Sequence, residues 1–297
     1  MHKYLEALRH PLLTAKGVVT YRFPQLLWAR YNRLAMHAGL RGLSFVLSFD
    51  CDTVEDADVV LSVDAKLRRM GVNPVYAVPG ELLAEAAAIY QELAARGAEF
   101  INHGHTKHTF WNTQNNRHES CFFYDELSLD EVRQDMLQGH ESVTQVIGTP
   151  PKGYRAPHFG CFQSQAQLVF LHEVIRELGY TYSSSTIPRH AFEKGPIHYF
   201  GACAEFPVSG WWRNPLSIQD SWGYMAAPHA SLGPQAYLEH ARETAAQFTR
   251  RGYAGVLNYY ADPSHIHDVP EFFEAVGVWA KAARPTTYSE ILQGLRA

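Results

Sequence analysis

The sequence predicts an α/β protein, built as a (β/α) barrel of about seven strands. Along most of its 297 residues, apolar runs of strand length alternate with segments of helical periodicity. Strands that alternate with helices of about 10–15 residues are typical of βαβ units and a parallel sheet. About seven such units favour a barrel over an open sheet, and the chain is long enough to bury one barrel-sized core.

Each expected strand is a short apolar run, and a helical segment follows most of them. We expect strands at residues 43–49, 74–78, 98–101, 153–156, 180–183, 204–208 and 255–260. We expect helices at residues 56–70, near 81–96, and at 129–147, 165–178, 235–251, 270–282 and 287–295. Ser128 and Glu131 have the spacing of a capping box at the start of the third helix, and Gly179 can end the fourth.

The first 42 residues stand apart from this alternation. We expect residues 1–42 to form a helical extension packed on or beside the barrel, and residues 43–297 to form the catalytic domain. Residues 21–31 mix aromatic side chains with Arg. One interpretation is an amphipathic helix that touches the membrane interface or a lipid-linked substrate. The other, favoured because amphipathic surface helices are common, is a helix packed over the barrel floor.

Composition excludes several classes of protein. The formal net charge of −4 gives no electrostatic case for binding nucleic acid. The four cysteines are widely spaced without a CxxC motif, which is typical of free thiols in a reducing compartment. No apolar run approaches membrane-span length, and the N-terminal residues lack a signal-peptide h-region. We therefore expect a cytoplasmic protein, and no oligomeric state is indicated.

Two acidic residues lie where the first predicted strand ends. Asp50 and Asp52 are two positions apart, so on a strand both side chains point to the same face. In sheets and barrels of βα units, sites form at this end of the strands. Two like charges so close are costly unless a cation or a shared proton compensates them. The pair indicates a metal site or a carboxylate that acts as a base; the alternative is a capping Asp beside a solvated one.

A histidine-rich segment follows the strand predicted at residues 98–101. His103, His105 and His108 lie within six residues. Imidazole suits zinc and other borderline divalent metals, and a nearby carboxylate completes a three-ligand catalytic set with an open position. Because Asp52 also lies at a strand end, a metal site is favoured over a polar loop with incidental histidines.

Two other strand ends carry polar residues. Arg155 lies at the end of the strand predicted at residues 153–156, where it can pair with a carboxylate and hold it ionised. Asp262, His265 and His267 lie just past the last strong strand. These residues are candidates for positioning a base and for donating a proton.

Aromatic residues near the strand ends are candidates for binding substrate. They are Trp211, Trp212 and Trp222 in the loop after residues 204–208, with His158 and Tyr260 at two other strand ends. Aromatic rings at the rim of a site can stack on sugar rings. The alternative is that these side chains simply cover the core.

Together these segments resemble the polysaccharide deacetylase family, the NodB-homology group of carbohydrate esterases, over roughly residues 43–295. The first motif resembles the branch that has Phe-Asp-x-Asp/Glu, which includes deacetylases tied to cell-surface polysaccharide synthesis. The resemblance implies a distorted (β/α) barrel that binds one divalent metal, usually zinc, through one Asp and two His. It also implies removal of an N-acyl group from an amino sugar.

The resemblance extends to individual positions. It implies that Asp50 is the catalytic base, Asp52 the metal-binding carboxylate, His103 the first metal-binding His, and Arg155 the residue that orients the base. Residues 205–209, Glu-Phe-Pro-Val-Ser, are similar to a strand motif of the family, and residues 180–184 match the stretch after its penultimate long helix.

Two motifs depart from the family pattern. The family's second metal-binding His is normally four residues after the first, but Lys107 occupies that position here. Either a one-residue bulge brings His108 to the metal beside His103, or His105 and His108 form the pair. The first is favoured because His103 keeps the strand-to-loop register.

At the last motif the family usually has a His as catalytic acid, whereas this chain has Asp262 before Pro263. Asp262, His265 or His267 is the candidate replacement.

The function implied is a metal-dependent N-deacetylase in cell-surface polysaccharide metabolism. Its substrate would be a sugar nucleotide, a lipid-linked sugar at the inner membrane face, or a glycan. The alternatives are a deformylase or cyclic-amide hydrolase on a related barrel, and a non-catalytic glycan-binding relative that lacks the acid. The base–Arg pair favours an enzyme, because a barrel that only binds sugar does not need it.

Overall fold

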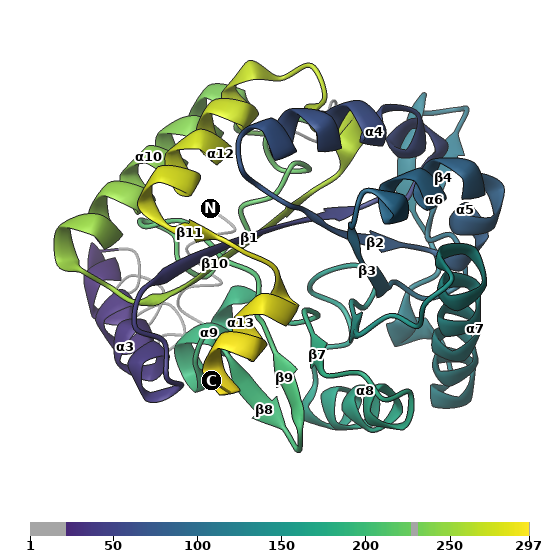
Figure 1. Ribbon diagram of the computed structural model, residues 1–297, viewed down its shortest axis with the longest axis horizontal. Helices are drawn as coiled ribbons and strands as arrows, with labels where there is room; N and C mark the ends of the chain where they lie inside the picture. Colours follow the sequence, from purple (N-terminus) through teal and green to yellow (C-terminus); the bar gives the residue numbers. More distant parts are fainter. Residues whose placement is uncertain (1–21, 227–230, 297) are drawn as a thin grey trace, which may run out of the picture.

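A computed structural model describes residues 22–226 and 231–296 of the chain. Figure 1 shows helices around a curved sheet whose strands cross the middle of the molecule. The strands lie in the order β10-β1-β2-β3-β6-β7-β9-β8, with β11 paired to β1. This is the α/β barrel architecture predicted from the sequence.

Parallel pairing runs through almost the whole sheet. Neighbours from β10 through β1, β2, β3, β6 and β7 to β9 all pair in parallel, which confirms the seven predicted strands, and β8 adds an antiparallel edge. The segment after β9 and strand β10 are joined by a few hydrogen bonds around Asn258 rather than by a regular ladder. The Ser209 N–H donates to the Asn258 carbonyl (2.8 Å), and the side-chain amide of Asn258 donates to the carbonyls of Phe206 (3.0 Å) and Pro207 (3.1 Å). The barrel is therefore distorted on this side.

The elements keep the labels of Figure 1. The strands are β1 (Leu43–Asp50), β2 (Val75–Val78), β3 (Glu99–Asn102), β4 (Thr109–Asn112), β5 (Arg117–Ser120), β6 (Gly153–Tyr154), β7 (Tyr182–Ser183), β8 (His198–Phe200), β9 (Cys203–Glu205), β10 (Gly255–Ala261) and β11 (Arg284–Pro285). The α-helices are α3 (Pro24–His37), α4 (Val54–Arg69), α5 (Gly80–Glu85), α6 (Ala87–Ala95), α7 (Leu129–Ile147), α8 (Gln165–Glu177), α9 (Pro188–Lys194), α10 (Pro234–Arg251), α11 (Pro263–Ile266), α12 (Pro270–Ala282) and α13 (Tyr288–Arg296).

Most predicted elements are confirmed, and the main difference is a broken helix. The capping box of Ser128 and Glu131 begins α7, and all four cysteines are free. The helix expected near residues 81–96 is interrupted at Ala86, whose φ of −112° and ψ of 33° are not helical. The first half is tied to the loop after β3, because the Gly80 and Glu81 N–H groups donate to the carbonyls of Gly104 and His105. The second half packs Tyr90 against Phe100.

Helix α3 lies against the barrel through its aromatic side chains. The Trp28 indole N–H donates to the Trp212 carbonyl (2.9 Å), and the Tyr31 hydroxyl donates to the Val256 carbonyl (2.7 Å). Both rings are buried, whereas Phe23 and Leu26 are exposed. The rest of the predicted extension, residues 1–21, lies outside the described residues. The division of the chain at residue 42 and the membrane contact stay predictions.

In the described part of the chain, no helix combines the length and apolar character needed to cross a membrane.

Candidate active site

The polar residues predicted from the strand ends meet at one end of the barrel. Asp50 ends β1, and His103, Arg155 and Asp262 directly follow β3, β6 and β10. Parallel strands bring their C-terminal ends to the same face, so these side chains converge there. Asp50, His103 and Asp262 border a pocket of about 270 Å³, whose full lining is Asp50, Asp52, His103, Thr109, Ser120, Phe123, His158, Phe159, Cys161, Asp220, Trp222, Tyr260 and Asp262.

Asp50 forms a buried ion pair with Arg155. The Arg155 Nη1 group donates to Asp50 Oδ1 at 2.5 Å, and the guanidinium is fully buried. Burial alone would lower the pKa of Arg155, but the charge of Asp50 and its hydrogen bond raise that pKa above its ordinary value. The guanidinium therefore stays charged and forms a close ion pair with Asp50.

Arg155 is itself held by residues far away in the sequence. Its Nε and Nη2 groups donate to the carbonyl and the hydroxyl of Ser184, both at 3.1 Å. Nη2 also donates to the hydroxyl of Tyr288 (2.9 Å), which donates in turn to Asn258 Oδ1 (2.7 Å). Arg155 is therefore fixed in one orientation, with only Nη1 directed to Asp50.

Replacing Tyr288 with Phe should lower the free energy of unfolding by about 1–3 kcal/mol, because buried partners on Arg155 and Asn258 lose their hydrogen bonds. Urea unfolding of the variant measures this loss. Tyr199→Phe is the matched control, since Tyr199 is 54% exposed, and should leave the midpoint unchanged. Equal midpoints for the two variants would contradict the role assigned to Tyr288.

Asp52, His103 and His108 form a compact set of possible metal ligands. One donor atom from each lies within 4.8 Å of the others, and all three residues are buried. The Nε2 atoms of His103 and His108 lie 3.5 and 3.0 Å from Asp52 Oδ1. A carboxylate with two imidazole nitrogens is a donor set that suits zinc and similar divalent cations.

Unpartnered atoms in this set fit a cation. Asp52 Oδ1 and both ring nitrogens of His108 are buried without hydrogen bonds; the close approach of His108 to Asp52 lacks hydrogen-bond geometry. Buried polar atoms without partners are costly unless something else satisfies them. The Nδ1–H of His103 donates to the Arg155 carbonyl (2.8 Å), which leaves its Nε2 with a free lone pair in the neutral ring.

Asp52 and the histidines of the ligand set shift the pKa values of one another. Burial opposes ionisation of Asp52, but His108 and His103 outweigh it and hold the pKa of Asp52 well below its ordinary value. Burial likewise lowers the pKa of His108, and the charge of Asp52 reverses this and raises it. The site thus favours a negative carboxylate next to a positive charge, which a cation can also supply.

The loop after β3 explains why His108, rather than His105, reaches Asp52. His105 Nδ1 hydrogen bonds with Ser142 Oγ (3.1 Å) on α7. The Thr106 N–H donates to Asp135 Oδ1 (2.8 Å), and the Lys107 N–H donates to Glu81 Oε2 (2.7 Å). These bonds hold residues 105–107 of the loop on the side of α5 and α7, which leaves His108, five residues after His103, to reach Asp52.

Asp262 lies deep in the pocket in a hydrogen-bonded group. Its N–H donates to Ser221 Oγ (2.9 Å), and the Ser221 hydroxyl lies 3.3 Å from Asp262 Oδ1 and 3.1 Å from His265 Nδ1. Burial raises the pKa of Asp262 well above its ordinary value, and four neighbouring carboxylates, led by Asp56 and Asp52, raise it further. This carboxyl favours the protonated form. His265 Nδ1 lies 3.6 Å from Asp262 Oδ2, while His265 itself lines a neighbouring cavity.

The aromatic residues named from the sequence divide into two groups. His158, Trp222 and Tyr260 line the pocket. Trp211 and Trp212, expected at its rim, instead lie outside its lining. Trp211 stacks on the ring of His240 (centroids 4.7 Å apart), and Trp212 stacks on Trp28 in the core (5.9 Å).

His158 is a neutral residue of the pocket wall. Burial and the nearby charge of His108 lower the pKa of His158 to about 4. Its Nε2–H donates to the Cys121 carbonyl (2.8 Å), and its ring lies against Phe123 with centroids 4.6 Å apart.

Asp220 is a pocket residue that sequence reasoning missed. Its Oδ2 accepts a hydrogen bond from the Tyr260 hydroxyl (3.0 Å), and its Oδ1 accepts one from the Gly223 N–H (2.9 Å). Burial raises the pKa of Asp220. The residue lies within a long loop after β9, so no strand end marks it in the sequence.

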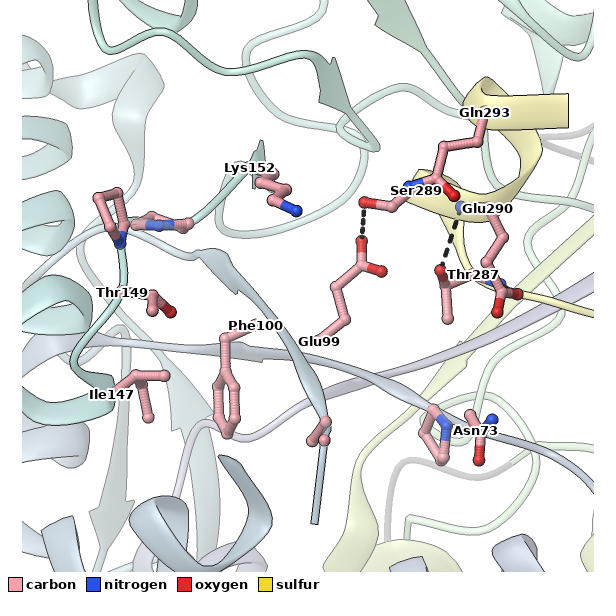
Figure 2. Close-up of a pocket in the computed structure, with 15 residues that line it drawn as sticks. Asn73, Glu99, Phe100, Ile147, Thr149, Lys152, Thr287, Ser289, Glu290 and Gln293 are labelled. Atoms are coloured by element: carbon pink, nitrogen blue, oxygen red, sulfur yellow. Dashed lines mark hydrogen bonds between the residues drawn. The ribbon is translucent and has the colours of Figure 1, made fainter. Parts of the chain in front are cut away.

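A second cavity, of about 370 Å³, lies at the opposite end of the barrel, where β2, β3 and β6 begin. Figure 2 shows Glu99 bonded to Ser289, and Glu290 beside Thr287. Both carboxylates hold the start of α13, because Glu290 Oε2 also accepts the Thr287 N–H (3.0 Å). Carboxylates with structural partners are typical of the stabilising end of such a barrel.

Residues 41–183 match the family model described as polysaccharide deacetylase. That region contains the Asp50–Arg155 pair and the three possible metal ligands, and it ends before Asp262. No curated protein matches the sequence.

Solved structures share the fold at low sequence identity. A polysaccharide-deacetylase-like protein from Mycobacterium smegmatis has a TM-score of 0.65 at 18% identity, covering 86% of this chain and 91% of that one. Puue allantoinase has a TM-score of 0.60 and a probable polysaccharide deacetylase from Pseudomonas aeruginosa PAO1 has 0.59, each at 11% identity and covering 86% of this chain and 90% of the other.

Proposed function

Because the chain belongs to the polysaccharide deacetylase family, whose members hydrolyse amide or ester bonds, we propose that it removes an N-acyl group from an amino sugar. The observation that carries the proposal is that Asp50, which is paired with buried Arg155, lines the same pocket as Asp52 and His103, two of the three possible metal ligands. A pocket that only bound sugar would gain nothing from a carboxylate paired with a buried Arg next to a metal-ligand set.

Asp52, His103 and His108 would hold a divalent cation, for which zinc is the best match to one carboxylate and two imidazoles. When bound, such a cation supplies an activated water and polarises the scissile carbonyl. His103 contributes Nε2, because its Nδ1–H is bonded to the Arg155 carbonyl.

Asp50 accepts the proton of the attacking water. Its Oδ1 is bonded to Arg155, which leaves Oδ2 to take the proton. Arg155 holds the Asp50 carboxylate in one orientation, so its second oxygen is placed to act as a general base. The cage of Ser184 and Tyr288 keeps this pair in place.

Asp262 donates a proton to the leaving amine. It is buried, and its raised pKa keeps the proton on the carboxyl that lies beside the pocket. Ser221 fixes its orientation, and His265 contacts the same hydroxyl. A carboxylate oriented by a buried guanidinium and a second carboxyl whose pKa is raised can serve as the base and the acid of this reaction.

Replacing Asp262 with Asn should lower kcat about 100-fold, because amine departure loses its proton donor. The wild-type rate should fall as pH rises through the raised pKa of Asp262, since only the protonated carboxyl is active, and the variant should lack this fall. A pH profile of kcat measures both. If His265→Ala removed the alkaline limb while Asp262→Asn kept it, the acid would be His265.

The identities of the acylated substrate and of the bond that is hydrolysed are also proposals. A glycan, a lipid-linked sugar and a sugar nucleotide all present the N-acyl group that this site would hydrolyse. Because Puue allantoinase shares the fold, cyclic-amide hydrolysis is the second candidate function. Assays of amine release from N-acetyl and N-formyl sugars, set against ring opening of a cyclic amide, distinguish these reactions. Release of amine from none of the acylated sugars by metal-loaded protein would overturn deacetylation.

A further inference from the structure

Helix α3 has one side that packs on the barrel and one that faces outward. Its buried residues, Pro24, Trp28, Tyr31 and Ala35, recur every three or four positions and therefore share one side. Figure 1 shows the helix on the outside of the barrel, and it packs against α9 and β10. The side opposite Trp28 and Tyr31 is therefore open to contact with another molecule.

This outward side carries large apolar side chains. Leu26 is 61% exposed and Met36 is 52% exposed, and both lie opposite the buried residues because the helix turns once in 3.6 residues. Phe23, which directly precedes the helix, is 51% exposed. Single exposed apolar residues are normal on a protein surface, but three along one helix indicate a surface that meets an apolar partner.

The same side is basic. Arg30 and Arg33 are exposed, and they follow Leu26 by four and seven positions, so they share its side of the helix. Residues 22–42 contain four Arg and no Asp or Glu. In the sequence, residues 7–49 contain six Lys or Arg and no acidic residue, although the whole chain has 26 basic against 30 acidic residues. Positive charge is therefore concentrated in one segment of an acidic protein.

The helices around α3 add to this positive charge. Helix α9 carries Arg189, Glu193 and Lys194, and Arg189 Nε donates to Glu193 Oε1 at 2.6 Å. The charge of Lys194 is then in excess on α9. At the end of α10, the Arg251 guanidinium lies 4.8 Å from the centre of the Trp212 ring, which stacks on the Trp of α3. An anionic partner is therefore favoured over a cationic one.

The catalytic pocket lies away from this surface. The Tyr31 hydroxyl donates to the carbonyl of Val256, the second residue of β10, whereas Asp262 of the pocket follows the end of the same strand. Six residues of strand span about 20 Å. A partner bound to the outward side of α3 therefore leaves the pocket open.

From the exposed apolar side chains and the local positive charge, we propose that the outward side of α3 binds the surface of an anionic phospholipid bilayer. Phe23, Leu26 and Met36 enter the boundary between head groups and acyl chains, while Arg30 and Arg33 contact the phosphates. The packed and the membrane-facing interpretations of this segment then apply to opposite sides of one helix.

A second copy of the chain is a poorer match to this surface. A symmetric dimer places the same patch of both copies face to face, so the arginines of one α3 would lie close to those of the other. Like charges at such an interface are unfavourable, whereas a bilayer that contains anionic lipid attracts them.

Flotation of the metal-loaded, full-length protein with lipid vesicles tests the proposal. Vesicles of phosphatidylcholine alone are compared with vesicles in which about one third of the lipid is phosphatidylglycerol, at about 0.1 M salt. Wild-type protein should partition about tenfold or more strongly into the anionic vesicles. Raising the salt to about 0.5 M should weaken this binding, because ions screen the charges.

Two variants with matched controls locate the binding surface. Leu26→Ser and Arg33→Glu should each weaken partition into anionic vesicles about tenfold. Leu129→Ser, at a 48% exposed position on α7, and Arg69→Glu, at the exposed end of α4, should bind as wild type does. Urea unfolding of all four variants shows that they are folded.

Three results would overturn the proposal: no binding of wild type to either kind of vesicle, equal binding to both kinds, and equal losses in the test and control variants. Sedimentation velocity without vesicles measures the competing outcome. A wild-type dimer that Leu26→Ser converts to a monomer, together with no vesicle binding, would assign the outward side of α3 to an interface between two copies.

Discussion

Replacing Asp50 with Asn should lower kcat by about 10²–10⁴-fold and leave the metal content of the protein unchanged. The amide keeps the size of the side chain and an oxygen for the Arg155 hydrogen bond (2.5 Å), but it cannot accept the proton of the attacking water. The three possible metal ligands are other residues, so metal binding should persist. Steady-state kinetics and metal analysis of the same sample measure the two quantities.

The control for this experiment must exclude loss of folded protein. Removing the carboxylate leaves the buried Arg155 charge without its partner, which costs about 3–5 kcal/mol in comparable buried pairs. Urea unfolding therefore accompanies the kinetics. The rates of the variant and of wild type are compared per mole of folded protein. Asp58→Asn, a substitution at an exposed position on α4, should change neither kcat nor the metal content. A folded, metal-bound Asp50→Asn protein with a near wild-type rate would show that Asp50 is not the base.

The sequence predicted best the elements that carry strong local signals. The bounds of α7 and α12 agree with the predicted helices, because apolar periodicity and the Ser128 cap mark them. The β4–β5 hairpin was missed. Its second strand contains the polar residues Arg117 and Glu119. The cross-strand pairs of the hairpin, such as Trp111 with His118, become visible only in the structure. Alternation of apolar and polar residues, the usual signal, is weak there.

The candidate site could be predicted only where residues follow strand ends. Asp50, Asp52, His103 and Arg155 lie close to such ends, and the barrel brings those ends together. Asp220 and Tyr288 have no such mark. Tyr288 reaches Arg155 across 133 residues of sequence, and Asp220 meets Tyr260 across 40.

The same limit applies to aromatic residues, because an aromatic side chain suits a core and a sugar site equally well. Trp212 packs in the core against Trp28, whereas Trp222 lines the pocket. Their sequence surroundings do not separate the two outcomes.

Replacing His108 with Ala should reduce bound metal from about one ion per chain to near zero and abolish measurable turnover. His108 supplies one of three donor atoms that lie within 4.8 Å of one another, and two remaining ligands hold a divalent cation poorly. Metal analysis after dialysis against a weak chelator measures the loss, and kcat measures its consequence.

His105→Ala is the matched control, because it removes the same kind of side chain three residues away on the same loop. His105 is bonded to Ser142, so its loss should cost about 1 kcal/mol of stability and leave metal binding intact. The pair of variants thus tests the five-residue spacing between the two ligands. If His105→Ala emptied the site and His108→Ala kept its metal, the ligand pair would be His103 with His105, and the hydrogen bonds that hold His105 to α7 would have to break when metal binds.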